Sequence, residues 1–286
     1  MLQGAIAGLA SGGLYAVLAV CLTLMARLVR VVNFAQAATG MFGAFCAVWL
    51  VSTLGWSIPL ASIVGILVGG ALSALLGWII ATWLSEASTS TRSAVTVGPL
   101  LLLISLSFIM FGNKPQPFEP IIQGPAFQVV GVAVSWLTVT TVVMAVVIAV
   151  AAALVLDRTS VGTKLRALSE RPITAELIGI PSRPLSVAVW AVTGVISALV
   201  IIIVAPSQAN DATSLSMLIV PAAAAALVGG FRRLDLSVVG GLLLGALTGL
   251  VAQIDALSAV RNFVPFLVIV GFLLWMQRKE VWDAAR

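Results

Sequence analysis

The chain has 286 residues, of which 61% are hydrophobic and only 9% are charged. A soluble domain carries about 25% charged residues, so this chain has too little polar surface to fold in water. Its formal net charge of +5 fits basic loops that orient membrane helices and lie against anionic lipid headgroups, rather than a nucleic-acid-binding surface. The composition therefore predicts an all-α polytopic membrane bundle that forms a single domain over residues 1–286.

Nine apolar segments approach the length of about 20 residues that a helix needs to cross a bilayer. The first segment lacks the basic start of a signal peptide and is longer than its apolar region, so a retained helix is expected. The segment at 215–229 is short and contains Pro221 and the pair Gly229–Gly230, which indicates a broken or re-entrant helix. We expect a broken helix that still crosses, within eight or nine spans. The segments are 4–26, 33–51, 60–84, 95–112, 129–156, 185–205, 215–229, 236–253 and 260–277.

The second segment begins with polar residues in apolar surroundings. Asn33, Gln36 and Gly40 are three and four residues apart, so they can share one face of a helix. Phe34 and Thr39 lie between them. One interpretation is the lining of a substrate pathway or an interface with a partner subunit. The alternative is hydrogen bonding between helices, with small residues that allow close packing.

A long polar loop at 157–184 holds five cations and three acids. Helices are predicted over about 161–171, ending at Pro172, and over about 173–178, ending at Gly179. The reason is that proline favours the start of a helix and glycine the position after its end.

The second of these short helices would bring Ile173, Leu177 and Ile180 close together among polar neighbours. A short amphipathic element of this kind can lie on the membrane surface or dock into a groove of a cytoplasmic protein. The Ser/Thr-rich residues 85–93, in contrast, are expected to form a flexible turn on the same side of the membrane.

The cations predict the orientation, because lysine and arginine in short loops concentrate on the cytoplasmic side. With the N-terminus outside and the C-terminus inside, only Lys114 and Arg261 of the fifteen cations lie outside. The thirteen inner cations are Arg27, Arg30, Arg92, Arg158, Lys164, Arg166, Arg171, Arg183, Arg232, Arg233, Arg278, Lys279 and Arg286.

No pattern in the chain indicates catalysis. The sequence has no histidine, no GxxxxGK[ST] phosphate loop, no Cys/His metal cluster and no GxSxG motif. An enzyme, a resident cofactor and a metal are therefore not expected. Glu119, Asp211 and Asp255 fall in outer loops, which leaves no carboxylate at mid-bilayer and disfavours a proton-coupled secondary transporter.

Three blocks resemble the branched-chain amino-acid ABC transporter permease family. The first block resembles that family's G-x-Y-A-L-x-A and N-F-A-H-G signature, the second its cytoplasmic coupling segment and the third its glycine-rich late helices. The blocks are residues 13–19 (GLYAVLA) with 32–35 (VNFA), 162–170 (GTKLRALSE) with 175–180 (AELIGI), and 226–230 (ALVGG) with 240–245 (GGLLLG).

The resemblance implies one transmembrane half of an importer in the bacterial inner membrane. Its partners would be a second permease subunit, by family habit a paralogue, two cytoplasmic ATPase subunits that hold the ATP and Mg²⁺, and a periplasmic or lipid-anchored solute-binding protein. The resemblance also favours the docking interpretation of the loop 157–184. The residues that it assigns to ATPase coupling are Gly162, Arg166, Ala167, Glu170, Ala175, Leu177, Gly179 and Ile180.

The chain departs from the family signature at Gln36 and Ala37, where the family has histidine and glycine. Gln36 can donate and accept hydrogen bonds but cannot titrate. The resemblance implies that the solute is a branched-chain or related amino acid. The departures affect the identity of this solute rather than the fold, so urea, short amides and carboxylates are the alternatives.

Overall fold

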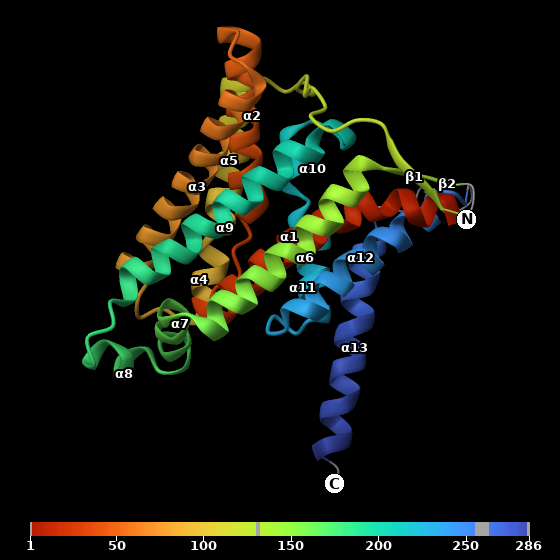
Figure 1. Ribbon diagram of the computed structural model, residues 1–286. Helices are drawn as coiled ribbons and strands as arrows, with labels where there is room; N and C mark the ends of the chain where they lie inside the picture. Colours follow the sequence, from red (N-terminus) through yellow and green to blue (C-terminus); the bar gives the residue numbers. More distant parts are fainter. Residues whose placement is uncertain (1, 130–131, 255–262, 285–286) are drawn as a thin grey trace.

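The computed structural model of the chain describes residues 2–129, 132–254 and 263–284, and it is a helical bundle with one small hairpin (Figure 1). The helices are α1 (Leu2–Leu28), α2 (Gln36–Leu54), α3 (Ile58–Trp83), α4 (Thr89–Val95), α5 (Val97–Phe111), α6 (Trp136–Arg158), α7 (Ser160–Glu170), α8 (Pro172–Leu177), α9 (Ser182–Val204), α10 (Ala212–Ser216), α11 (Ile219–Val228), α12 (Leu234–Val251) and α13 (Val264–Ala284). The strands are β1 (Pro125–Val129) and β2 (Val132–Ser135), and a 3-10 turn follows α9 at Ala205–Ser207.

Seven helices in the described part of the chain are long and apolar enough to cross a membrane. They coincide with seven of the predicted segments, which confirms a polytopic helical bundle. The ranges are Gln3–Leu28, Gln36–Leu54, Ile58–Trp83, Thr89–Phe111, Trp136–Arg158, Ser182–Ser207 and Leu234–Val251. Arg261 and Asp255, both expected in an outer loop, lie outside the described residues.

Two local predictions are wrong. The apolar segment at 129–156 begins as a hairpin, in which β1 pairs antiparallel with β2, and its helix starts only at Trp136. Ser135 ends the strand because its Oγ accepts the Thr138 amide at 3.1 Å and so caps α6. Residues 89–93 are helical rather than a flexible turn, because Ser88 caps α4 in the same way.

The broken helix predicted at 215–229 is present. α10 ends at Ser216 and α11 starts at Ile219, so Pro221 lies in the first turn of α11, where a missing amide hydrogen costs no helix bond. α11 ends in a Schellman motif, with the Phe231 amide bonded to the Ala226 carbonyl at 3.0 Å and Gly230 at φ +58°.

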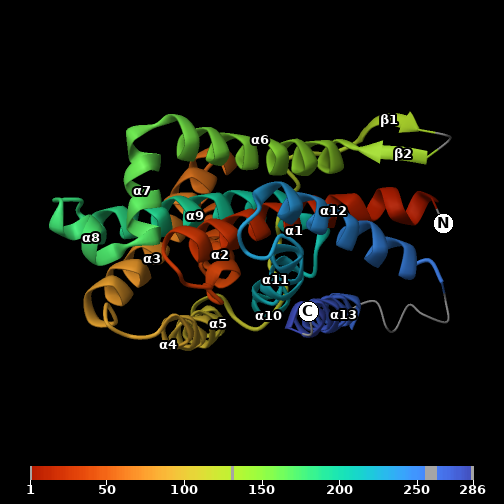
Figure 2. The same ribbon diagram turned by 90° about the horizontal axis from the view of Figure 1, so that it is seen from below.

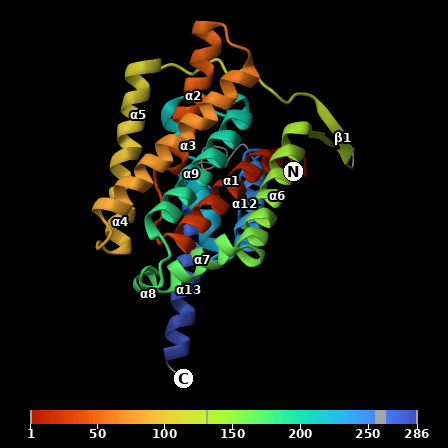
Figure 3. The same ribbon diagram turned by 60° about the vertical axis from the view of Figure 1, so that its left-hand side comes forward.

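α1 is the central helix and contacts α6, α9, α11 and α12, and a second group is formed by α2, α3 and α9. Figure 2 shows α6 alongside α1, with the hairpin at one end and α7 and α8 at the other. Figure 3 shows the far part of α13 extending beyond the rest of the bundle. α13 contacts α11 and α12.

Glycines allow α1 and α12 to pack backbone against backbone. Three glycines at every fourth position of α1 face three on α12 in antiparallel order: Gly4 with Gly249, Gly8 with Gly245, and Gly12 with Gly241. A Cβ atom on Gly4 would lie 2.5 Å from the Gly249 carbonyl oxygen, and one on Gly241 would lie 2.5 Å from the backbone of Ala16. We call these six residues the glycine seam. Lipid removes the hydrophobic drive for helix association, so such close packing is what holds the pair together.

The predicted inner loops gather at one end of the bundle, opposite the N-terminus and the hairpin (Figure 1). Arg30 at the end of α1 donates to the carbonyl of Glu170 in α7 at 3.0 Å, and the amide of Val32 donates to Ser93 in α4 at 2.9 Å. Arg27 and Arg232 line one common groove there. We call this end the cationic end. The other end, which we call the outer end, holds the loop before the hairpin, where the Gln116 amide donates to the carbonyl of Asn210 at 2.9 Å.

At the glycine seam, replacing glycine by alanine should lower stability, although the same substitution elsewhere in a helix raises it. Glycine to alanine inside a helix normally stabilises it by about 1 kcal/mol, and Gly271 in α13 has open space where a Cβ would lie. Gly245→Ala should instead destabilise the protein by about 1–3 kcal/mol, because its Cβ overlaps the backbone of Gly12. Thermal melting of Gly245→Ala and Gly271→Ala in detergent provides the measurement. Equal melting temperatures for the two variants would refute the seam.

Candidate functional site

The polar residues at the start of α2 form a closed hydrogen-bond network inside the chain. Asn33 Nδ2 donates to Gln36 Oε1 at 3.0 Å, and Asn33 Oδ1 accepts the Ala35 amide at 3.0 Å. Gln36 Nε2 donates to the Thr193 carbonyl at 2.8 Å and to Ser197 Oγ at 2.6 Å, both on α9. Because each amide is paired, burial of these groups in an apolar interior carries no unmet desolvation cost.

This network lies in the interior of the single chain. Asn33, Gln36 and Thr39 are 0% exposed, and Thr39 bonds back to the Gln36 carbonyl at 2.9 Å. Gly40 is also buried, and a Cβ on it would lie 2.9 Å from the Ser197 carbonyl oxygen on α9. Phe34 is half-buried, and its amide donates to Thr96 Oγ1 at 2.9 Å. These contacts favour hydrogen bonding between helices over a pathway lining.

The partners of the chain segment before α2 were not anticipated from the sequence. Ser93 Oγ accepts the Val32 amide at 2.9 Å, and Thr96 Oγ1 accepts the Phe34 amide. These two hydroxyls satisfy amides that precede a helix and have no carbonyl partner within it. The Ser/Thr content of 85–93 was the available signal for Ser93, but it indicated a turn and gave no partner, and Thr96 lay outside that stretch.

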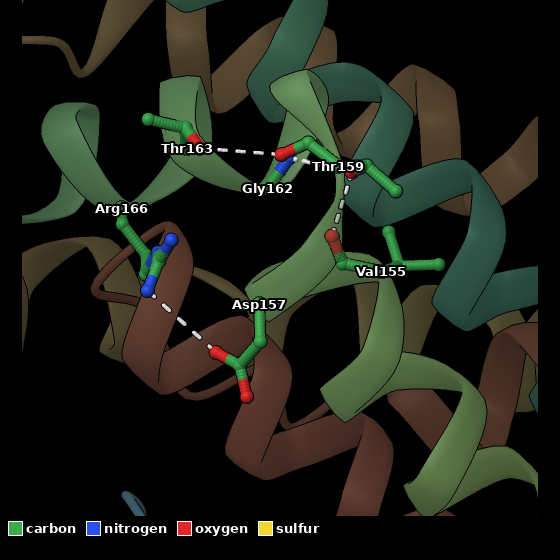
Figure 4. A network of polar contacts seen from close by, with 6 residues as sticks. All are labelled: Val155, Asp157, Thr159, Gly162, Thr163 and Arg166. Carbon is green, nitrogen blue, oxygen red and sulfur yellow. Dashed lines mark hydrogen bonds and ion pairs between the residues drawn. The ribbon is translucent and has the colours of Figure 1, made fainter.

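The loop at 157–184 folds as the two predicted short helices, and Gly162 fixes the sharp turn between α6 and α7 (Figure 4). Thr159 caps α7, because its Oγ1 accepts the Gly162 amide at 3.0 Å. A Cβ on Gly162 would lie 2.5 Å from the Cα of Leu156. Arg166 reaches back to Asp157 with an ion pair of 3.6 Å between largely exposed side chains, which contributes little stability.

α7 packs on the bundle, whereas α8 projects from it. Leu165 and Leu168 of α7 are buried, Ala167 is partly buried, and Glu170 is exposed. Gly179, at φ +84°, closes α8 in a Schellman motif. The Ile180 amide donates to the Ala175 carbonyl at 3.0 Å, and the Gly179 amide donates to the Glu176 carbonyl at 2.9 Å.

The exposed apolar surface of α8 differs from the expected trio. Leu177 is 82% exposed and Ile178 is 71% exposed, so these two neighbours form the apolar tip. Ile180 is half-buried beyond Gly179, and Ala175 is buried. The side chain of Ile173, the third expected member, lies outside the described part of the chain.

A cavity of about 790 Å³ opens at the outer end, between α1, α10, α11, α12 and the start of α13. We call it the outer cavity. Its described lining contains hydroxyl and amide side chains and no charged side chain. Gln208 Nε2 donates to Ser11 Oγ across it at 3.1 Å. The polar lining residues are Ser11, Tyr15, Ser207, Gln208, Thr213, Ser214, Thr248 and Gln253.

Sequence reasoning did not identify the outer cavity as a site. Ser11 and Tyr15 are four residues apart on α1, and residues 207–216, which include α10, are mostly polar. Both signals were present, but the sequence does not show that α1 and α12 lie beside this segment. Gly4, Gly8 and Gly249 of the glycine seam also line the cavity.

Asp211 holds the start of α10, one wall of the outer cavity. Its Oδ1 accepts the Ser214 amide at 2.9 Å. Burial raises the pKa of Asp211, but hydrogen bonds from Ser214 and the Thr213 amide outweigh it, so this pKa lies below its usual value. The ionised carboxylate therefore stabilises the fold at neutral pH, and this contribution is lost as the pH falls through the folded-state pKa.

The hydrogen-bond network predicts a measurable coupling between α2 and α9. Gln36→Leu leaves the buried Asn33 Nδ2 without its acceptor and should lower stability by about 1–3 kcal/mol. In a double-mutant cycle, Gln36→Leu and Ser197→Ala should couple by about 0.5–1.5 kcal/mol. Unfolding of the four proteins of the cycle in detergent provides the values. If Gln36→Leu abolishes transport without changing stability or coupling, the pathway interpretation is correct instead.

Comparison with known proteins agrees with this architecture. A protein family described as "Branched-chain amino acid transport system / permease component" matches residues 4–273, nearly the whole chain. No curated protein and no solved structure gives a match to it. A permease component is a transporter rather than an enzyme, and it works with other transporter subunits. With its membrane-spanning helices, the chain belongs to the permease-component family of branched-chain amino acid transport systems.

Proposed function

We propose that the chain is the transmembrane subunit of an ATP-driven importer that moves branched-chain or related amino acids across the bacterial inner membrane. The observation that carries this proposal is the projecting helix α8. It presents Leu177 and Ile178, 82% and 71% exposed, at the end of the bundle where the cations gather. An apolar tip of this kind fits the groove of a cytoplasmic partner. In this proposal the partner is one of two ATPase subunits, which bind ATP and Mg²⁺.

The proposed topology places the cationic end in the cytoplasm and the N-terminus outside, by the bias of arginine and lysine. α10 and α11 together form one crossing, and α13 returns the C-terminus to the cytoplasm, for nine spans in total. A second permease subunit, proposed to be a paralogue, completes the pathway. A periplasmic or lipid-anchored binding protein delivers the solute to the outer end.

The outer cavity is proposed as the entrance for the solute. Its hydroxyl and amide groups can bond the ammonium and carboxylate of an amino acid, while Met217, Leu218 and Phe266 offer apolar contact to its side chain. A short amide or urea would also suit this neutral lining. A dicarboxylate fits less well, because no cation lies among the described lining residues. The absence of a lining carboxylate equally disfavours proton coupling within the described part.

Coupling through α8 can be tested with two glycines that each end a helix at a positive φ angle. Gly179 and Gly55 have φ angles of +84° and +65°, and at both a Cβ would have no other atom within 4 Å. Valine costs about 1–2 kcal/mol at either place because the left-handed region disfavours a Cβ. Gly179→Val should abolish ATPase copurification or ATP-driven uptake, whereas Gly55→Val, in the turn between α2 and α3, should retain both. Normal uptake by Gly179→Val would contradict the assignment.

The outer cavity can be tested by removing hydroxyls with little change in volume. The double variant Ser11→Ala/Thr248→Val should weaken amino-acid uptake about fivefold to a hundredfold, since each lost hydrogen bond contributes about 0.5–1.5 kcal/mol. Thr82→Val is the matched control, because the buried Thr82 hydroxyl has no partner in the described structure. ATPase assembly should be unchanged in both. Unaltered concentration dependence of uptake in the double variant would exclude the cavity from the pathway.

A further inference from the structure

A second large cavity lies at the cationic end, apart from the outer cavity and from α8. It has a volume of about 1230 Å³ and lies between α6, the ends of α1 and α7, and the start of α12. We call it the basic groove. Figure 3 shows these helices converging, with α7 crossing the end of α6. Its lining is Ala26, Arg27, Arg30, Val146, Ala149, Val150, Ala153, Ser169, Glu170, Gly230, Phe231, Arg232, Arg233, Leu234, Asp235 and Val238.

The rim of the basic groove carries positive charge that the chain does not neutralise. Arg233 is paired with Asp235 at 2.6 Å, and Arg30 donates to the Glu170 carbonyl. Arg27 and Arg232 make no side-chain hydrogen bond or ion pair with any described residue. Two unpaired guanidinium groups in one groove attract an anion, and the planar guanidinium matches phosphate oxygens with paired hydrogen bonds.

One wall of the basic groove is apolar and extends far along α6. Val146, Ala149, Val150 and Ala153 recur at spacings of three and four, so they share one helix face. Val146 and Val150 remain 45% and 52% exposed. Val146 lies twelve residues before Arg158, the last residue of α6. At 1.5 Å per residue this is about 18 Å, or about half of a 30 Å hydrocarbon core.

We propose that the basic groove binds an anionic phospholipid, with its phosphate on Arg27 and Arg232 and an acyl chain along the α6 wall. A free phosphate would leave this wall uncovered. A cytoplasmic protein would reach the arginines but not Val146, about 18 Å deep along α6. Only an amphiphile with an anionic head matches both parts, and basic pockets between transmembrane helices at the cytoplasmic surface are known to hold such headgroups.

The bound lipid would join the end of α1 to the start of α12. Arg27 belongs to α1, and Arg232 precedes α12 in the turn after α11. Its phosphate would therefore hold α1 and α12 together at the end of the glycine seam, beyond the last glycine pair, Gly12 with Gly241, where larger side chains follow. Anionic lipid should accordingly raise the melting temperature of the chain, whereas zwitterionic lipid should not.

The test is native mass spectrometry of the purified, delipidated full chain, titrated with cardiolipin or with phosphatidylethanolamine. Arg27→Gln/Arg232→Gln should weaken cardiolipin binding about thirtyfold, at about 1 kcal/mol per arginine, and leave phosphatidylethanolamine binding unchanged. The control Arg158→Gln/Arg183→Gln removes the same charge at the same end, outside the groove lining. Equal loss in both double variants would overturn the site in favour of general charge attraction.

A second pair of variants tests the wall without altering charge. Val150→Trp fills the groove and should weaken cardiolipin binding about fivefold or more, whereas Val147→Trp, 57% exposed and outside the lining, should not. Equal binding by the two would overturn the proposal, as would displacement of cardiolipin by equimolar inorganic phosphate. Loss of ATPase subunits from the Arg27→Gln/Arg232→Gln complex, with lipid binding intact, would reassign the groove to a protein contact.

Discussion

Backbone-to-backbone packing of α1 against α12 is the constraint on which the other features depend. Six glycines at every fourth position remove the side chains that would separate the two helices. In a bilayer, where lipid is as apolar as leucine, this close contact replaces hydrophobic burial as the source of helix association. The antiparallel pair places the start of α1 beside the end of α12 at the outer cavity. It equally places the end of α1 beside the start of α12, where Arg27 and Arg232 share the basic groove.

The second helix group combines the same close packing with polar specificity. Gly43 faces Gly65 between α2 and α3, and Gly194 on α9 lies against Ser73 on α3. Gln36 then fixes the register of α2 on α9 through two hydrogen bonds. Close packing alone tolerates sliding along a glycine face, whereas a buried amide without its partners costs about 1–3 kcal/mol. This network therefore selects one arrangement of helices that small residues merely permit.

The proposed coupling element is attached to the central helix rather than to the bundle surface alone. α7 buries Leu165 and Leu168 and ends where Arg30, two residues after α1, bonds to the Glu170 carbonyl. A displacement of α8 by an ATPase would reach α1 through this contact. The glycine seam extends from α1 to α12 and ends in the wall of the outer cavity. One series of contacting helices therefore joins the projecting Leu177–Ile178 tip to the proposed solute entrance, which supports the proposed importer.

The membrane class, the positions of seven spans, the break before Pro221 and the two short helices, the second closed by Gly179, could all be predicted from the sequence. Each of these depends on local properties, namely apolar length, capping and the left-handed freedom of glycine. What these elements contact emerged only from the packed bundle. Gln36 looked equally suited to a pathway until its partners on α9, 157 and 161 positions away, were known. The outer cavity and the basic groove could not be predicted for the same reason, because Ser11 bonds to Gln208, and Arg27 and Arg232 line one groove, only after distant helices pack together.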